Sequence, residues 1–403
     1  MHNSLDITRV NRYLAHKQRL LPGSRAADVM HATRDIVALH ATGPAGPYLS
    51  LWARMDDFER AALEDLLYER RELARVICMR STLHLVPTAE FPLFFQAYIQ
   101  RVRHESRRRA KFLLEGMELA QSGEAESLLE LLHARVLEFV RGRGVASAQE
   151  INRAVPELGA RYTYAWGKSY VGEFSIGTRI LGGMCDLGLL VRARPRGTWQ
   201  SSLYEYAPLS DWLPDVVLDS VTADAARSWL VGRYLTTFGP ATLDDAQWWT
   251  GFTKGETKKA LAGLGQEVVE VSIEGLGDGY LMLADDVERL RDFTAPDEPY
   301  AFLLPTLDPY IMGYGDRRRF LAPEHRDKII ERAGNAVPTV WANGRVVGAW
   351  LQRKDGSVTY GLFELVEEDV LPLLEGEIRR LEGFMGGEVI ASRYYTPFTR
   401  ALR

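Results

Sequence analysis

The sequence has little cysteine and no long apolar run. Its two cysteines, Cys78 and Cys185, exclude a disulfide-stapled scaffold and a cysteine-rich metal site. We interpret both as reduced core thiols of a cytosolic protein. No stretch approaches the roughly 18 apolar residues that a membrane span requires. Residues 1–21 also lack the apolar core of a secretory signal, so we expect a cytoplasmic protein with no membrane partner.

Several ligand-binding motifs are also missing. No phosphate-binding GxxxxGK[ST] sequence occurs, which argues against a P-loop nucleotide hydrolase. The glycine-rich stretch 176–188 lacks the preceding strand that a dinucleotide site needs, and it is interpreted as a recognition-type helix with small packing residues. No histidine, cysteine and carboxylate cluster has metal-ligand spacing. The sequence therefore predicts neither a metal nor a cofactor.

Charge is distributed unevenly along the chain. The 403 residues are 46% hydrophobic and carry a formal net charge of −5, which excludes a wholly basic nucleic-acid coat. Arginines nevertheless gather in three runs, at 101–111, 192–196 and 317–319. The planar fork of arginine suits phosphate because it donates two hydrogen bonds at once. Any single run can also be a solvated face, whereas three runs in an acidic chain favour one basic surface.

The spacing of apolar residues predicts a repeated helical unit. Helices are expected at 6–20 and 26–41, with a longer one from Asp56 or Asp57 to about residue 76, before a β-rich run at 77–87. A further helix is expected from residue 90 to 120. The same order then returns twice as a helix, a capping box and a second helix, followed by a two-stranded hairpin. The expected helices and hairpins of the two repeats are 127–144, 147–155, 176–188 and 190–209, then 223–239, 242–252, 253–265 and 267–285.

The last hundred residues change to β-type patterning. Alternation surrounds Asn343-Gly344 and Asp355-Gly356, which are hairpin-turn dipeptides. A helix is expected at 367–385 and a final β segment at 387–395. The sequence thus predicts a mainly α protein with α+β character, in which three tandem winged helix-turn-helix domains precede a β-rich domain, built as a curved sheet or a small barrel. The expected limits are 1–122, 123–215, 216–298 and 299–403.

Five segments carry a family resemblance, at 37–54, 79–87, 234–252, 303–317 and 343–356. In this order they resemble the winged-helix bacterial DNA glycosylases that unhook interstrand crosslinks and confer azinomycin resistance. The resemblance implies a monofunctional glycosylase that hydrolyses the N-glycosidic bond of alkylated or crosslinked purines during base excision repair. It also implies a monomer that acts on damaged double-stranded DNA, associated with the nucleoid.

The resemblance assigns the catalytic position to residues 40–42. The family usually has Gln-x-Gln or Gln-x-Asp there, and this chain has His40-Ala41-Thr42. His40 and Thr42 are therefore the candidate catalytic residues: a neutral imidazole can accept a proton from water, and a hydroxyl can orient that water. The alternative for His40 is a satisfied histidine at the end of the expected helix, where the helix dipole favours it.

A larger set of polar side chains is predicted to contact DNA. Alternation along 80–84 places Arg80, Thr82 and His84 on one strand face, and the tyrosines and lysine of 161–170 are expected in a loop. Tryptophans such as Trp248 and Trp249 could stack on bases, although core packing is the commoner role. The predicted DNA contacts are Arg54, Arg80, His84, Arg101, Arg103, Arg107, Arg108, Arg109, Tyr162, Tyr164, Lys168, Arg179, Arg192, Arg194, Arg196, Arg353 and Lys354.

Two functions therefore stay open at this point. The first is the DNA glycosylase, and the second is a non-catalytic winged-helix protein that regulates or shields DNA. The composition of the pair at 40 and 42 does not decide between them, because it contains neither the usual amide nor a carboxylate. The sequence also leaves open which lesion is bound, and whether a base is flipped out of the duplex.

Overall fold

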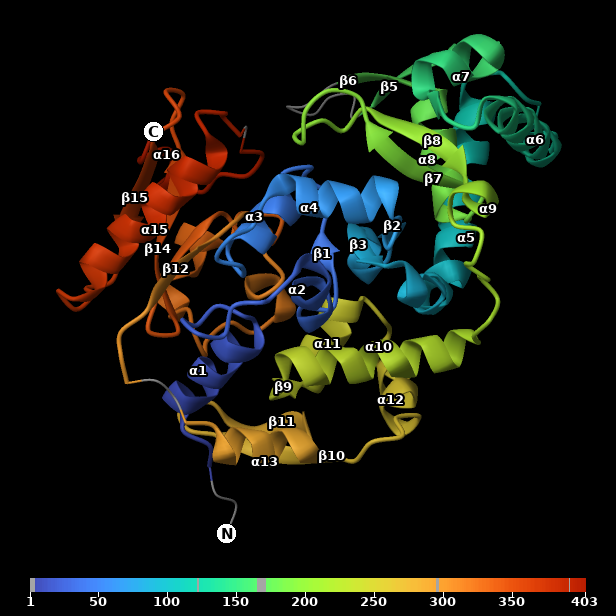
Figure 1. The fold of residues 1–403 in the computed structure, drawn as a ribbon. Coiled ribbons are helices and arrows are strands. Elements are labelled where there is room, and N and C mark those ends of the chain that lie inside the picture. Colours follow the sequence, from blue (N-terminus) through green and yellow to red (C-terminus); the bar gives the residue numbers. More distant parts are fainter. Residues whose placement is uncertain (1–3, 122, 165–171, 295–296, 391) are drawn as a thin grey trace. The chain divides into compact units, whose positions relative to one another are not determined.

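The protein is described by a computed structural model that covers residues 4–121, 123–164, 172–294, 297–390 and 392–403. The chain forms two compact units. Unit 1 combines Met1–Leu63 with Arg227–Arg403, and unit 2 is Glu64–Ala226. Both contain helices and small antiparallel sheets (Figure 1), in agreement with the expected α+β character. Within the described ranges, every helix is too short or too polar to cross a bilayer.

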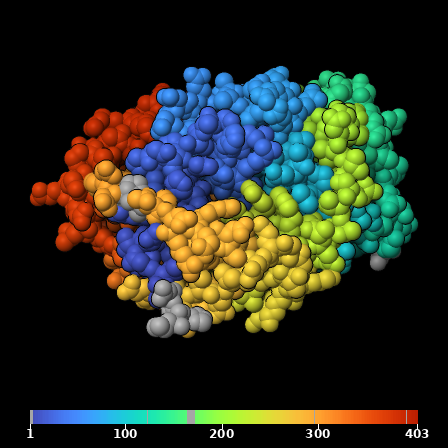
Figure 2. Space-filling model, turned by 60° about the horizontal axis from the view of Figure 1, so that its bottom comes forward, coloured from blue at the N-terminus to red at the C-terminus, as the bar shows by residue number. Residues whose placement is uncertain are grey.

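Unit 1 begins with helix α1 (Ile7–Lys17), whose N-cap Asp6 accepts a hydrogen bond from the Arg9 amide. The face that carries Val10 and Leu14 is buried. The Arg9 guanidinium donates to the carbonyl of Leu290, and Figure 2 shows the N-terminal segment beside that part of the chain. Helix α1 is therefore attached to a segment almost 300 residues further along.

Helix α2 (Val29–Asp35) ends six residues before the expected limit at 41. Val37 adopts a positive φ of 71°, which no residue of a right-handed helix has. The chain then enters the two-residue strand β1 (Leu39–His40) and helix α3 (Gly46–Trp52). The expectation that His40 lies at a helix terminus is therefore wrong.

The expected helix up to residue 76 is also shorter. Helix α4 (Arg60–Glu64) continues as a π-helical turn at Asp65–Glu69, and the chain then turns at Arg71, whose φ is 56°. Leu73–Ile77 is strand β2 of a hairpin with β3 (Leu83–Pro87). The alternating burial of this segment favours a strand once the positive φ has ended the helix.

The third predicted repeat lies mainly in unit 1, and its elements follow the predicted order. Helix α10 (Ala223–Phe238) precedes α11 (Leu243–Thr250), α12 (Lys254–Ala262) and the hairpin β10 (Val268–Ile273) and β11 (Gly277–Leu283). Thr242 and Asp245 form the predicted capping box, and β9 (Ala241–Thr242) pairs with β11. Helix α13 (Ala284–Asp292) follows directly.

The β-rich end of the chain forms an open sheet. Strands β12 (Ala301–Leu304), β13 (Thr339–Ala342), β14 (Arg345–Gln352) and β15 (Val358–Leu362) pair antiparallel in chain order. Asn343 and Gly344 both have positive φ, as the predicted two-residue hairpin turn requires. Of the two expected forms, the structure therefore has a sheet and not a closed barrel. The 3₁₀ turns at Ile311–Gly313 and Pro323–His325 and the short helix α14 (Arg326–Ile329) lie between β12 and β13.

Helix α15 (Val370–Met385) covers the expected helical segment and leads to the short helix α16 (Pro397–Arg400). The β segment expected at 387–395 is wrong, because its described residues form no strand. The side chain of Gln352 bonds the backbone of this segment instead, donating to the Glu388 carbonyl and accepting from the Ile390 amide. Side-chain bonds thus take the place of a strand ladder.

Unit 2 contains the second predicted repeat. Helix α5 (Phe91–Gly116) precedes α6 (Ala125–Arg143), the bridging strand β4 (Ala146–Ser147) and α7 (Ala148–Ala154), which starts at the predicted Ser147–Glu150 capping box. A 3₁₀ turn at Pro156–Gly159 and a hairpin of β5 (Arg161–Tyr164) and β6 (Gly172–Ser175) follow, and then α8 (Ile176–Asp186). Strands β7 (Leu190–Pro195) and β8 (Tyr204–Pro208) form the predicted second hairpin, which helix α9 (Leu209–Trp212) follows.

One buried ion pair joins distant segments of unit 1. The two terminal nitrogens of Arg54 donate to the two carboxylate oxygens of Asp308, each at 2.8 Å, and both side chains are fully enclosed. Asp308 also accepts from the Ser50 hydroxyl and the Tyr310 amide. This bidentate pair links the residues just after α3 to the loop after β12.

Removal of one partner should destabilise unit 1 strongly. Asp308→Asn leaves the Arg54 guanidinium buried without a counter-charge, and we expect the free energy of unfolding to fall by about 3–5 kcal/mol. Urea denaturation followed by circular dichroism measures the change. The matched control is Asp327→Asn, because Asp327 pairs with Arg326 on the surface; its effect should stay below about 0.5 kcal/mol. Equal losses in both variants would contradict this assignment.

Candidate functional site

The predicted catalytic pair lies on an exposed turn of unit 1. Leu39 and Ala41 point into the core, at 0% and 3% exposure, so the alternation of an extended chain turns His40 and Thr42 the other way. His40 is half-buried and Thr42 is exposed. The Thr42 hydroxyl lies 3.3 Å from Nε2 of His40. The structure thus brings together the two side chains that the sequence selected.

The turn is held from behind by close backbone packing. Gly43 and Pro44 lead into α3, and the Gly46 amide donates to the Gly43 carbonyl at 3.0 Å. A Cβ at Gly46 would lie 3.0 Å from the carbonyl oxygen of His40. Glycine at 46 therefore allows the first turn of α3 to approach the backbone that carries the imidazole.

An arginine that could not be identified from the sequence contacts this turn. Nη1 of Arg393 donates to the carbonyl of Thr42 at 3.5 Å, across 351 positions of sequence. Arg393 lies in the segment after α15 that was expected to be a strand. No local pattern distinguishes it from other surface arginines, since only the fold brings it to residue 42.

The pair offers a base and an orienting hydroxyl for one water molecule. A neutral imidazole protonated at Nδ1 has an acceptor at Nε2, and the Thr42 hydroxyl within reach can donate or accept. A water beside the pair that contacts both groups can receive a hydrogen bond from Thr42 and release a proton to His40. The arrangement is chemically suited to hydrolysis, although it has no carboxylate that would stabilise a cationic sugar.

Arg54 is not a DNA contact, contrary to the sequence prediction. Its side chain is 0% exposed and its guanidinium is occupied by Asp308 and the Ser50 carbonyl. A phosphate could reach it only if the core opened and left Asp308 without its cation. The position of Arg54 at the end of the resembling segment 37–54 therefore reflects packing.

Arg80, Thr82 and His84 do not form the common strand face that the sequence predicts. Met79–Ser81 is a 3₁₀ turn in which Arg80 has a φ of 54°, so regular alternation begins only at Leu83. His84 is 7% exposed, and its Nδ1 lies 3.0 Å from the Thr82 carbonyl and 3.4 Å from Sγ of Cys78. His84 is therefore a core residue of unit 2 and does not line a DNA channel. Arg80 is half-buried, and burial lowers its pKa.

The basic run on α5 is largely solvent-exposed. Arg107 pairs with Glu126 at 3.0 Å and Arg109 with Glu105 at 2.9 Å. Arg103 and Arg108 are exposed, and neither forms an ion pair in the part of the chain that the structure describes. Arg101 is half-buried. Two of the five predicted arginines on this helix are thus fully available to an external anion.

The arginines of the β7–β8 hairpin are engaged by carboxylates of unit 2. Arg194 bridges Glu64 and Glu69, both at 2.9 Å, and Arg196 bridges Glu150 and Glu205 at the same distance. Each guanidinium therefore lies between two negative charges. This charge pairing was invisible in the sequence, where only the arginines stand together.

The remaining predicted DNA contacts are scattered over both units. Tyr162 and Tyr164 lie on strand β5, so the described part of the expected loop is a strand. Lys168 lies outside the described residues. Arg192 is half-buried and its Nη2 is 3.9 Å from Asp186. The exposed members are Arg179 on α8 and, at the β14–β15 turn, Arg353 and Lys354.

The third basic run, 317–319, is mostly internal. Arg317 is 9% and Arg319 is 3% exposed, and Arg319 donates to the Pro240 carbonyl. Arg318 is exposed but doubly bonded to Asp316. This run therefore supports unit 1 and does not form an open basic surface.

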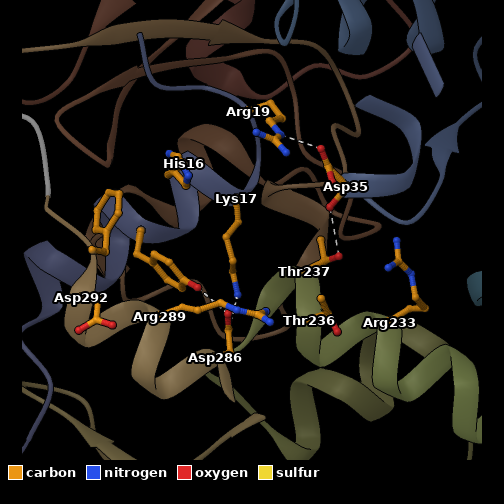
Figure 3. Close-up of a pocket in the computed structure, with 12 residues that line it drawn as sticks. His16, Lys17, Arg19, Asp35, Arg233, Thr236, Thr237, Asp286, Arg289 and Asp292 are labelled. Atoms are coloured by element: carbon orange, nitrogen blue, oxygen red, sulfur yellow. Dashed lines mark hydrogen bonds and ion pairs between the residues drawn. The ribbon is translucent and has the colours of Figure 1, made fainter. Parts of the chain in front are cut away.

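Unit 1 also contains a polar cavity of about 470 Å³ between α1, α10 and α13 (Figure 3). Its buried cation Lys17 is bonded to Asp286 at 2.7 Å, and Tyr13 donates to the other carboxylate oxygen. Burial lowers the pKa of the Lys17 amine, and Asp286 opposes this shift. Arg19 is bonded to Asp35, and both line the cavity. These charged groups neutralise one another within the fold.

With this geometry in place, the chain can be compared with known proteins. The profile of the family described as "DNA glycosylase AlkZ-like" matches residues 33–384. The chain belongs to the AlkZ-like DNA glycosylase family. The matched range begins before α3 and includes the His40–Thr42 turn.

The chain is also similar to one curated protein and to one solved structure. The "Interstrand DNA cross-link repair glycosylase" of Streptomyces sahachiroi is 34% identical over 131 residues, 32% of this chain. The match spans 34%, about a third, of that relative's length. The solved structure of Streptomyces sahachiroi DNA glycosylase AlkZ has a TM-score of 0.70 at 20% identity, and the match covers 97% of this chain and 99% of that chain. The second likeness shows that the AlkZ fold extends over nearly the whole chain.

The packing behind the turn can be tested by substitution. Gly46→Ala places a methyl group against the His40 carbonyl, and we expect it to lower the free energy of unfolding by about 1 kcal/mol. The matched control is Gly43→Ala, where a Cβ would meet nothing within 4 Å. Urea denaturation of both variants measures the difference. Equal stability of the two would mean that the turn is not held by this close approach.

Proposed function

We propose that the protein is a monofunctional DNA glycosylase that hydrolyses the N-glycosidic bond of alkylated or crosslinked purines in DNA. The observation that carries the proposal is the contact of 3.3 Å between Thr42 and His40 on an exposed turn inside the family-matched range. The name of the curated relative, an interstrand cross-link repair glycosylase, supports the same substrate class.

The proposed step uses a water that lies beside the pair and contacts both His40 and Thr42. Its oxygen attacks the anomeric carbon while the bond to the purine nitrogen breaks, and the bond electrons leave with the base. A purine alkylated at N7 is already cationic, so it departs as a neutral base without an acid. His40 Nε2 accepts the proton of the attacking water, and Thr42 orients that water. The products are the free base and an abasic sugar.

Damaged double-stranded DNA is the proposed partner, bound by one monomer in the nucleoid. The exposed guanidiniums of Arg103 and Arg108 are suited to phosphate oxygens, which give affinity without sequence choice. The proposed domains are three winged helices at 1–122, 123–215 and 216–298, followed by a β-rich domain at 299–403. The capping boxes and wing-like hairpins at 190–208 and 268–283 support this division.

The alternative function is a non-catalytic DNA-binding protein on the same scaffold. The observation that favours it is the pair itself, since residues 40 and 42 contain neither the amide nor the carboxylate of the usual motif. Such a protein would bind DNA through the same arginines and form no abasic product.

The test of catalysis is abasic-site formation. Duplex DNA with a labelled N7-alkylguanine is incubated with wild type and variants and then cleaved with alkali. His40→Ala should reduce the rate about 100-fold, because it removes the general base. The matched control is His31→Ala, an exposed histidine on α2 that should leave the rate unchanged.

Two outcomes would contradict the proposal in different ways. Product that His40→Ala leaves unchanged would place the chemistry at other residues. Absence of product on alkylated, crosslinked, deaminated and oxidised bases alike, with salt-sensitive DNA binding intact, would establish the alternative function.

The role of the α5 arginines is tested by the salt dependence of binding. Arg103→Gln/Arg108→Gln removes two phosphate contacts, so the slope of log K against log salt should become shallower by about 2. The control with the same charge change is Arg194→Gln/Arg196→Gln, whose arginines are held by glutamates. Its slope should match wild type. A slope that both variants change equally would show only a general charge effect.

A further inference from the structure

Unit 2 contains a groove of about 450 Å³ to which no role has been assigned above. Its two walls are helices α5 and α8. Glu105, Ser106 and Arg109 line it from α5, and Arg179, Gly182 and Asp186 line it from α8. Tyr162 and Phe174 of the β5–β6 hairpin lie at its border. A volume of this size is typical of small-ligand sites.

The groove exists because α8 presents glycine to α5. A Cβ at Gly183 would lie 2.5 Å from the Ser106 hydroxyl, so the two helices touch at this point. A Cβ at Gly182 would meet only Nη2 of Arg192, at 3.6 Å. The backbone of α8 is therefore bare at 182, and a flat group can lie against it.

The end of the groove contains an incompletely bonded carboxylate. Oδ1 of Asp186 is buried and accepts no hydrogen bond from any described residue. The nearest cation, Nη2 of Arg192, is 3.9 Å away, beyond hydrogen-bond distance. Burial raises the pKa of Asp186, and Arg192, Arg179 and Arg109 oppose this shift. A buried acceptor without a donor is costly, so a ligand that supplies N–H groups here is favoured.

The other groups around the groove suit a nucleotide. Arg179 is exposed and forms no ion pair within the described ranges, whereas Arg109 is shared with Glu105 at 2.9 Å. Tyr162 and Phe174 face each other across the hairpin with ring centroids 6.4 Å apart, and Phe174 is 43% exposed. Aromatic faces stack on bases and arginine binds phosphate.

We propose that this groove binds a guanine base of DNA that lies outside the duplex, with Asp186 accepting hydrogen bonds from its N1–H and its exocyclic amine. Guanine alone among the DNA bases presents two adjacent donors on its Watson–Crick edge. Adenine and cytosine place an acceptor beside their amine, and thymine has a single donor between two carbonyls. The site rests on the proposed function in one respect, namely that the protein binds DNA.

The test measures binding of labelled single-stranded nonamers by fluorescence anisotropy. The probes are oligothymidylates with one central guanine, hypoxanthine or adenine. Wild type should bind the guanine probe about tenfold more tightly than the adenine probe. The hypoxanthine probe should fall between them, because it retains N1–H and lacks the amine.

Asp186→Asn should weaken binding of the guanine probe about tenfold and leave the adenine probe unchanged. An amide can present only one acceptor, so it cannot satisfy both donors. The matched control is Asp211→Asn, which removes the same charge from an exposed position of unit 2. This control should keep the preference for guanine.

A second variant tests the groove without touching a charge. Gly182→Leu fills the bare backbone position, and it should abolish the preference while thermal unfolding reports an intact fold. Equal affinity of wild type for the guanine and adenine probes would overturn the proposal, as would a guanine preference that survives Asp186→Asn.

These readouts do not require base excision. A guanine preference without any abasic product would support the proposed guanine site and contradict the proposed glycosylase activity. Glycosylase activity without a preference among the three probes would contradict only the proposed guanine site.

Discussion

Unit 1 depends on the buried ion pair between Arg54 and Asp308. Its two hydrogen bonds of 2.8 Å fix the chain after α3 to the loop after β12, inside a region that water does not reach. Because α3 begins only a few residues after Thr42, this ion pair also restricts where the turn of the proposed catalytic pair can lie. A charge buried so deeply is costly without its partner, so loss of either residue should destabilise the packing of α3.

The candidate site is an exposed turn whose backbone is fixed by buried neighbours. Buried Leu39 and Ala41, the close approach of Gly46 and the Arg393 contact hold the backbone, while Thr42 is exposed and His40 is half-buried. For the proposed reaction, a backbone held in this way would keep the two side chains in a fixed arrangement without a deep cleft. The exposure of Thr42 is compatible with the bulky crosslinked base of the proposed function.

Helix caps and the tight turn could be predicted from the sequence, whereas several helix ends and the long-range partners could not. The Ser147 and Thr242 capping boxes and the Asn343-Gly344 turn were all predicted, because a helix start or a tight turn is decided by residues that are neighbours in sequence. Arg54 was mistaken for a DNA contact because Asp308 lies 254 positions away. Arg393 could not be predicted for the same reason. His40 and Thr42 were identified from the family resemblance and not from the spacing of residues.

The division of the chain into units has a consequence for its synthesis. Unit 2 is one continuous segment, whereas unit 1 is assembled from residues before 64 and after 226. At about 5–20 residues per second, a ribosome needs at least several seconds to supply the second part. During that interval unit 2 can fold, but α1 to α3 have neither the β12 loop nor Asp308 to pack against. The N-terminal segment therefore cannot complete its native packing, including the Arg54–Asp308 pair, until the last quarter of the chain has been synthesised.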